Sequence, residues 1–161
     1  MSDETVGATS GFKRSIRWGA VAFGWVLAVL TGIVVSTILR QMYGLIAEPQ
    51  VERGVFTAAV VVVSLVSGFL SYLVGGYVAA RTARYAGGRH GALTAVFGLI
   101  AGVILAIILA FFGIVFAEGV AVPPVAFGPI GAAWVAGSIL FLVNLFGGFV
   151  GGKLGEPITR P

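Results

Sequence analysis

Long stretches without charged residues alternate along this chain with short segments in which the charges gather. The uncharged stretches are residues 18–39, 54–80, 91–117 and 119–152. A helix of about 20 apolar residues crosses the roughly 30 Å of hydrocarbon in a bilayer, and each stretch is long enough to do so. We therefore predict transmembrane helices at about residues 18–40, 54–80, 90–117 and 125–152.

The apolar stretches favour helices over the strands of a membrane barrel. Barrel strands alternate between apolar and polar residues over about ten positions, whereas residues 60–63 and 103–112 are apolar at nearly every position. Lipid offers no partner for a free backbone N–H or C=O, so the β-branched residues of the second stretch should also be helical. The predicted fold class is an all-α integral membrane protein.

Composition supports a membrane protein and argues against a soluble domain. Apolar residues make up 58% of the 161 residues, charged residues 10%, and the mean hydropathy is +1.06. The first apolar stretch is too long for a cleavable signal peptide and has no convincing cleavage site, so we expect it to remain as a helix. Residues 1–12 should form a disordered cytoplasmic tail, and residues 13–161 a single transmembrane domain.

The basic residues predict how the chain is oriented. Eight Lys and Arg residues fall on one side of the four predicted spans and two, Arg40 and Arg53, on the other. Lys and Arg accumulate in short cytoplasmic loops, so both termini and the middle loop are expected in the cytoplasm.

The sequence contains an internal repeat at an offset of 72 residues. Residues 17–20 (Arg-Trp-Gly-Ala) align with 89–92 (Arg-His-Gly-Ala), and residues 69–81 align with 141–153 through shared Phe-Leu, Leu, Gly-Gly, Val and a basic residue. Each half would be a helical hairpin, and two copies with two spans each share one orientation. We expect a 2+2 arrangement about a pseudo-two-fold axis along the membrane normal.

Small residues at four-residue spacing predict the faces on which the helices pack, because close approach drives helix association in lipid. An alternative is that these glycines line a pore. The candidate packing positions are Gly24, Ala28, Gly32, Gly75, Gly76, Gly98, Gly102, Gly147, Gly148, Gly151 and Gly152.

Polar residues inside the predicted spans are few, and none is charged near a predicted midplane. They could form hydrogen bonds between helices or line a polar path, and Asn144 is the most demanding because its amide has four hydrogen-bonding positions. The candidates are Ser64, Ser67, Ser71, Tyr72 and Asn144.

The predicted cytoplasmic side is basic, with a sequence pI of about 10.0. Topology signals and attraction to anionic lipid headgroups explain this excess without nucleic acid, so we expect lipids as partners and no nucleic acid. His90 aligns with Trp18 in the repeat and is expected to anchor the chain at the interface. The candidate interface residues are Arg17, Arg81, Arg84, Arg89, His90 and Lys153.

The sequence offers no catalytic constellation. It has no cysteine and one histidine, and it lacks paired carboxylates and a glycine-flanked serine nucleophile. We therefore expect no enzyme activity, no cofactor and no metal site.

Residues 75–81 (Gly-Gly-Tyr-Val-Ala-Ala-Arg) and 90–92 (His-Gly-Ala) resemble a segment of the small uncharacterised bacterial four-span membrane proteins of the YrzE-like type. The resemblance covers about 20 residues and implies a protein of the bacterial plasma membrane. Two functions remain open. One is a packing or assembly subunit of a homo-oligomer or larger membrane complex; the other is a small oligomeric channel or facilitator, which would need a continuous polar path.

Overall fold

The computed structural model describes residues 15–46, 58–116 and 130–157, and these residues form four helices. The helices are α1 (Trp18–Ile46), α2 (Ala58–Ala83), α3 (Gly87–Phe116) and α4 (Ile130–Gly155). Each is long and apolar enough to cross a membrane, so the chain is a multi-pass membrane protein. The predicted tail at residues 1–12 and the second predicted outer loop lie outside the described residues, whereas residues 41–46, predicted as part of the first outer loop, continue α1 as helix.

The helices extend beyond the predicted spans at the charged ends. α2 continues through Arg81 to Ala83, and α4 continues through Lys153 to Gly155. A charge marks where apolar surroundings end, but backbone hydrogen bonding continues past that point, since long basic side chains can reach water from a helix. The sequence therefore located the spans better than the helix ends.

A tight turn joins α2 to α3. The Arg84 N–H donates to the Ala80 carbonyl at 2.8 Å, and Arg84 adopts a φ of 67°, as is common for the residue after a helix. Ala86 also has a positive φ of 46°, and its carbonyl accepts from the N–H groups of Arg89 and His90. The turn thus closes one helix and starts the next within three residues.

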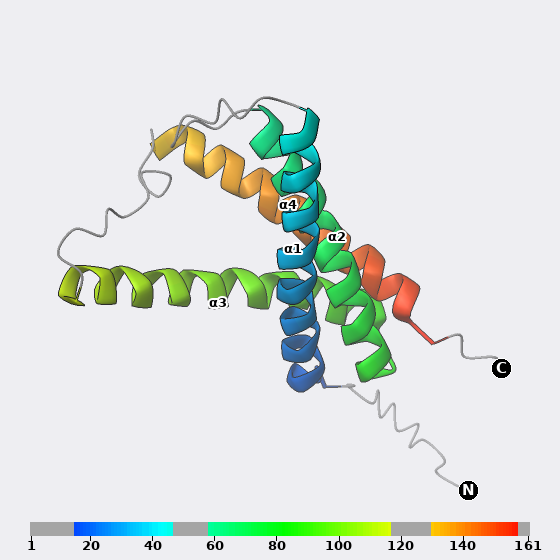
Figure 1. The fold of residues 1–161 in the computed structure, drawn as a ribbon. Coiled ribbons are helices and arrows are strands. Elements are labelled where there is room, and N and C mark those ends of the chain that lie inside the picture. Colours follow the sequence, from blue (N-terminus) through cyan, green and yellow to red (C-terminus); the bar gives the residue numbers. More distant parts are fainter. Residues whose placement is uncertain (1–14, 47–57, 117–129, 158–161) are drawn as a thin grey trace, which may run out of the picture.

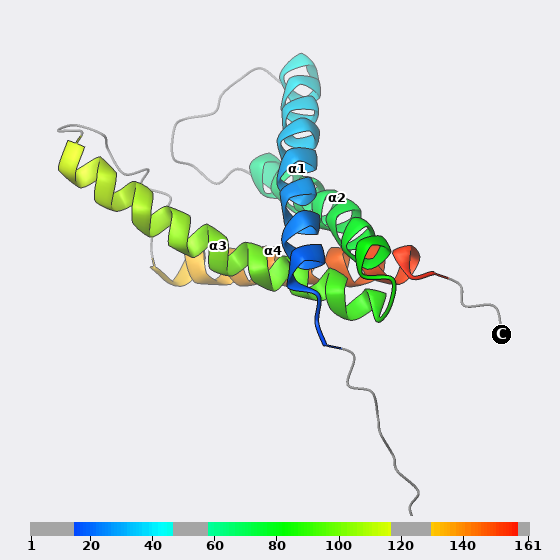
Figure 2. The ribbon, with the colours of Figure 1, turned by 90° about the horizontal axis from the view of Figure 1, so that it is seen from below.

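The helices pack tightly in one half of the molecule and diverge in the other (Figure 1). In both views, the later half of α3, drawn in yellow-green, leads away from α1 and α2 (Figure 2). Among the described side chains, none is buried beyond Ala28 in α1, beyond Gly98 in α3, before Ser67 in α2 or before Gly147 in α4. We call the tightly packed part the packed half and the remainder the open half.

The packed half contains the beginnings of α1 and α3 and the ends of α2 and α4, and its core consists mainly of small residues. Alanine and glycine occupy most of the buried positions, and the largest fully buried side chains are His90, Val21 and Thr94. Such a core lets backbones approach closely, which is how helices gain contact in lipid. The end of this half that is farthest from the open half is called the basic end. It carries Arg17, Arg81, Arg84, Arg89 and Lys153.

Candidate functional site

The predicted packing glycines of α1 and α2 meet directly. A Cβ atom on Gly24 would lie 2.6 Å from the Gly75 carbonyl oxygen, and one on Gly75 would lie 2.7 Å from the Cβ of Ala28. Real Cβ atoms essentially never come closer than 3.0 Å to a neighbour, so neither site accepts a side chain without movement. Contacts that lie later in α1 lie earlier in α2, so these two helices pack antiparallel.

Gly148 lies where three helices meet. A Cβ on Gly76 of α2 or on Gly91 of α3 would clash with the Gly148 backbone, and Gly152 is opposed in the same way by Gly87. A Cβ on Gly147 would lie 2.7 Å from the Phe69 carbonyl oxygen, and Gly151 faces Leu73. Contacts that lie later in α2 also lie later in α4, so these two helices pack parallel.

Gly102 differs from the other predicted packing residues. It is exposed, and a Cβ placed on it would have no heavy atom of a neighbouring helix within 4 Å. Gly98, one turn earlier, is covered by the Tyr72 hydroxyl and by Trp25. Gly102 therefore contacts no other described helix, because α3 has already left the other helices at that point.

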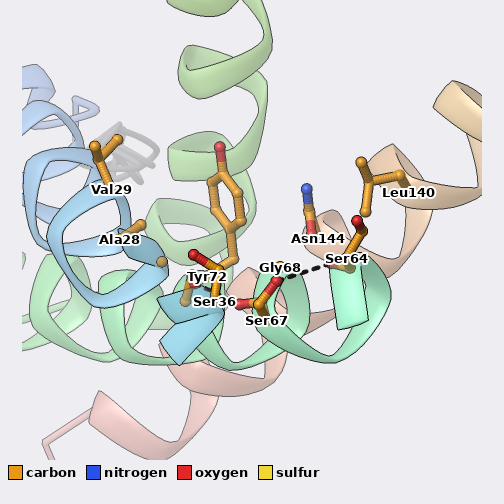
Figure 3. A pocket seen from close by; sticks show the side chains of 11 residues that line it. Ala28, Val29, Ser36, Ser64, Ser67, Gly68, Tyr72, Leu140 and Asn144 are labelled. Carbon is orange, nitrogen blue, oxygen red and sulfur yellow. Dashed lines mark hydrogen bonds between the residues drawn. The ribbon is translucent and has the colours of Figure 1, made fainter. Parts of the chain in front are cut away.

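The predicted polar residues converge on one cavity, of about 270 Å³, between α1, α2 and α4 (Figure 3). The cavity lies at the border between the packed and open halves. Its polar lining comes from all three helices: Ser36, Ser64, Ser67, Ser71, Tyr72 and Asn144.

The serine hydroxyls donate to their own helices. Ser67 Oγ donates to the Ser64 carbonyl at 3.3 Å, Ser71 Oγ donates to the Ser67 carbonyl, and Ser36 Oγ donates to the Ile33 carbonyl at 3.2 Å. Of the two alternatives for Ser67 and Ser71, a bond to a neighbouring helix or the lining of a polar path, their protons therefore do not supply the first. Because those protons are engaged, the oxygens face the cavity as acceptors.

Asn144 completes this acceptor surface. Its Oδ1 atom is buried and has no hydrogen-bond partner among the described residues. It lies against Gly68, where a Cβ would be 3.3 Å from the Asn144 Cγ, and Gly32 similarly leaves room for Ser71. The two glycines thus let polar side chains from neighbouring helices come close to the backbone.

This chemistry suits water or another hydrogen-bond donor. No lining residue carries a carboxylate, imidazole, amine or guanidinium group that could activate a serine. Among the described residues, no three His, Asp or Glu side chains come together. Ser36 was missing from the predicted site, although it continues the small-residue series of the first span at four-residue spacing.

His90 differs from the prediction of an interfacial anchor. It is 1% exposed, whereas its repeat equivalent Trp18 is 58% exposed. The His90 ring accepts a hydrogen bond from the Arg17 backbone and also contacts the Ala86 carbonyl. Imidazole has two hydrogen-bonding ring atoms, and both have partners at this buried position. Indole has a single donor and would leave one of these partners without a hydrogen bond.

The other predicted interface residues lie at the basic end and are exposed: Arg17, Arg81, Arg84, Arg89 and Lys153. Arg17 donates to the Thr82 carbonyl at 3.3 Å, and Lys153 pairs with Glu156 at 3.5 Å.

Comparison with protein-family models, with curated proteins and with solved structures finds no match to this chain. The resemblance of residues 75–92 to YrzE-like proteins therefore stays a prediction.

Proposed function

We propose that this chain acts by association with further membrane-spanning helices, as a non-enzymatic packing or assembly subunit of a homo-oligomer or larger membrane complex. The observation that carries this proposal is the open face of α3. Gly102 has no described residue of another helix within 4 Å of its Cβ position, and Ala106, on the same helical face, is exposed. We call Gly102 and Ala106 the open α3 face.

A small-residue face gains most when another backbone approaches it closely. Elsewhere this chain pairs glycines four residues apart on each of two helices, Gly87 and Gly91 with Gly148 and Gly152. The open α3 face has the same spacing and no partner within the described part of the chain. A second copy of this chain is the occupant that we favour, because it would bring a face of matching size and spacing.

We further propose the orientation and symmetry that the sequence predicts. Both termini would be cytoplasmic in a bacterial plasma membrane, and the two halves would be hairpins derived from a repeat. The approach of Gly76 to Gly148 supports the repeat, since these residues occupy equivalent positions at the offset of 72. The two copies of the repeat nevertheless pack their helices in different registers. Gly24 meets Gly75 in the first copy, and Gly91 meets Gly148 in the second.

Stoichiometry in mild detergent tests the proposed association. The purified wild-type chain should have a mass of two or more copies, and Gly102→Leu should shift it toward the monomer. The leucine meets no described residue of its own chain and removes a helix-weakening glycine, so helix content and thermal stability should not fall. Ile104→Leu, a conservative change on the opposite face of α3, is the control. A wild-type monomer, or equal behaviour of both variants, would overturn the proposal.

The polar cavity supports a second candidate, a small channel or facilitator. A pore needs a continuous polar line, and the cavity supplies one segment of it at the level of Ser67 and Ser71. Saturable or ion-selective flux from the pure protein in liposomes, abolished by Ser67→Leu or Ser71→Leu, would favour this candidate. Absence of flux from a stable oligomer would favour the assembly subunit.

A further inference from the structure

A second cavity, of about 420 Å³, lies at the basic end beside the turn from α2 to α3. It lies at the beginning of α3, before the open α3 face of the same helix, and its role does not depend on association. Its walls are mainly apolar, and they include one guanidinium group. The residues that matter for its chemistry are Ile16, Tyr85, Arg89, His90, Ala92 and Leu93.

Arg89 is the cation available to a ligand in this cavity. Three other basic side chains at this end have partners: Arg17 donates to the Thr82 carbonyl, Lys153 pairs with Glu156, and Arg81 lies 5.3 Å from the ring centroid of Tyr77. Arg89 is exposed and its side chain has no hydrogen bond or ion pair with any described residue. Glu156 is the single acidic residue in the described part of the chain.

The other polar groups of the cavity are already engaged. Both ring nitrogens of His90 lie against backbone groups, and the Tyr85 hydroxyl donates to the Ser15 carbonyl. The N–H groups of Arg89 and His90, in the first turn of α3, are bonded to the Ala86 carbonyl, and Gly87 and Gly88, which begin the helix, do not line the cavity. An anion in the cavity would therefore be bound by the Arg89 guanidinium and not by the helix N-terminus.

We propose that this cavity binds the phosphate group of an anionic amphiphile, with the Arg89 guanidinium on the phosphate and an acyl chain against Ile16, Ala92 and Leu93. A guanidinium can donate two parallel hydrogen bonds to phosphate oxygens. The candidate span of α3 begins at Gly87, so a bilayer crossed by this span would bring lipid headgroups to the level of Arg89. The apolar walls favour an anionic phospholipid over free phosphate, although both offer the same phosphate chemistry to Arg89.

The test compares two arginines in bilayer nanodiscs that contain equal amounts of phosphatidylglycerol and phosphatidylcholine. The full chain is extracted, and the ratio of the two lipids that stay bound is measured by native mass spectrometry. Arg89→Gln should lower the preference for phosphatidylglycerol about fivefold, which corresponds to about 1 kcal/mol per cation at a membrane surface. Arg81→Gln is the matched control, because Arg81 lies on the Tyr77 ring, and it should keep the wild-type preference.

Two further measurements sharpen the result. Arg89→Lys keeps the charge and loses the paired hydrogen bonds, so it should restore part of the preference. Inorganic phosphate added during extraction should not displace the lipid; displacement would assign the site to free phosphate and overturn the lipid as its source. Equal loss in Arg89→Gln and Arg81→Gln, or loss in neither, would overturn the site itself.

Discussion

The Arg17 backbone N–H donates a hydrogen bond to Nε2 of His90, 3.2 Å away. Because Nε2 is the acceptor, the ring carries its proton on Nδ1, which donates to the Ala86 carbonyl at 3.1 Å. The neutral imidazole thus joins the entry to α1, the turn after α2 and the first turn of α3. The Thr94 hydroxyl adds a hydrogen bond to the His90 carbonyl at 2.9 Å.

Replacement of His90 by phenylalanine should loosen the basic end. The variant keeps an aromatic ring, slightly larger than imidazole, but leaves the Arg17 N–H and the Ala86 carbonyl without their side-chain partner, which costs about 1–3 kcal/mol. The free energy of unfolding in a denaturing detergent titration measures this loss. Trp18→Phe, at the exposed position equivalent in the repeat, should cost much less, and equal losses would contradict the structural role of His90.

Alanine at two glycines of α4 should have opposite effects. Gly148→Ala places a methyl group against the Gly91 backbone and should destabilise the fold by about 1–3 kcal/mol, as overpacking does. Gly137→Ala meets open space and should stabilise the helix by about 0.5–1 kcal/mol. Thermal unfolding followed by circular dichroism measures both, and a shift of the same sign in both variants would refute the assigned contacts.

Ala86→Gly should stabilise the protein. Ala86 has a φ of 46°, a left-handed conformation that costs a residue with a Cβ about 1–2 kcal/mol and glycine very little. Ala95→Gly, in the buried interior of α3, should lower stability because glycine weakens a helix. The melting temperatures of the two variants should therefore move in opposite directions; a lower value for Ala86→Gly would contradict the turn geometry.

Asn144→Leu should stabilise the fold by about 1 kcal/mol or more. Leucine has the same branched arrangement of heavy atoms and removes a buried oxygen that has no partner among the described residues. Ser138→Leu, at an exposed position of the same helix, controls for a general gain in apolar surface. Equal stabilisation by both changes, measured by unfolding in detergent, would show that the Asn144 oxygen bears no penalty.

The four helices could be predicted because lipid leaves the backbone few alternatives, so gaps between charges were sufficient to locate them. The four-residue spacing of small residues predicted close packing at Gly24 and Gly148, because close approach drives helix association in lipid. The partner of each glycine did not follow, and Gly102 shows why: spacing identifies a face that can pack, whereas the crossing of the helices decides whether it does.

The burial of His90 could not be predicted from its neighbours in the sequence. Histidine can serve either as an interfacial anchor or as a buried hydrogen-bonding ring. The partner that decides between these roles, the Arg17 N–H, lies 73 residues away in the sequence. The Ser64, Ser67 and Ser71 group was found by its spacing on one helix. The Ser67 and Ser71 hydroxyls donate within α2 itself, but the cavity that their oxygens face is formed by the positions of α1 and α4, which the spacing on one helix does not give.

Disulfide formation in the membrane tests association through α3 most directly, because the chain has no cysteine of its own. Single substitutions Ala106→Cys, on the open α3 face, and Ile104→Cys, on the opposite face, are oxidised in native membranes and separated by non-reducing electrophoresis. Association through this face should give a dimer of twice the chain mass for Ala106→Cys and little or none for Ile104→Cys. Absence of a dimer for Ala106→Cys, or equal dimer from both positions, would contradict association through this face.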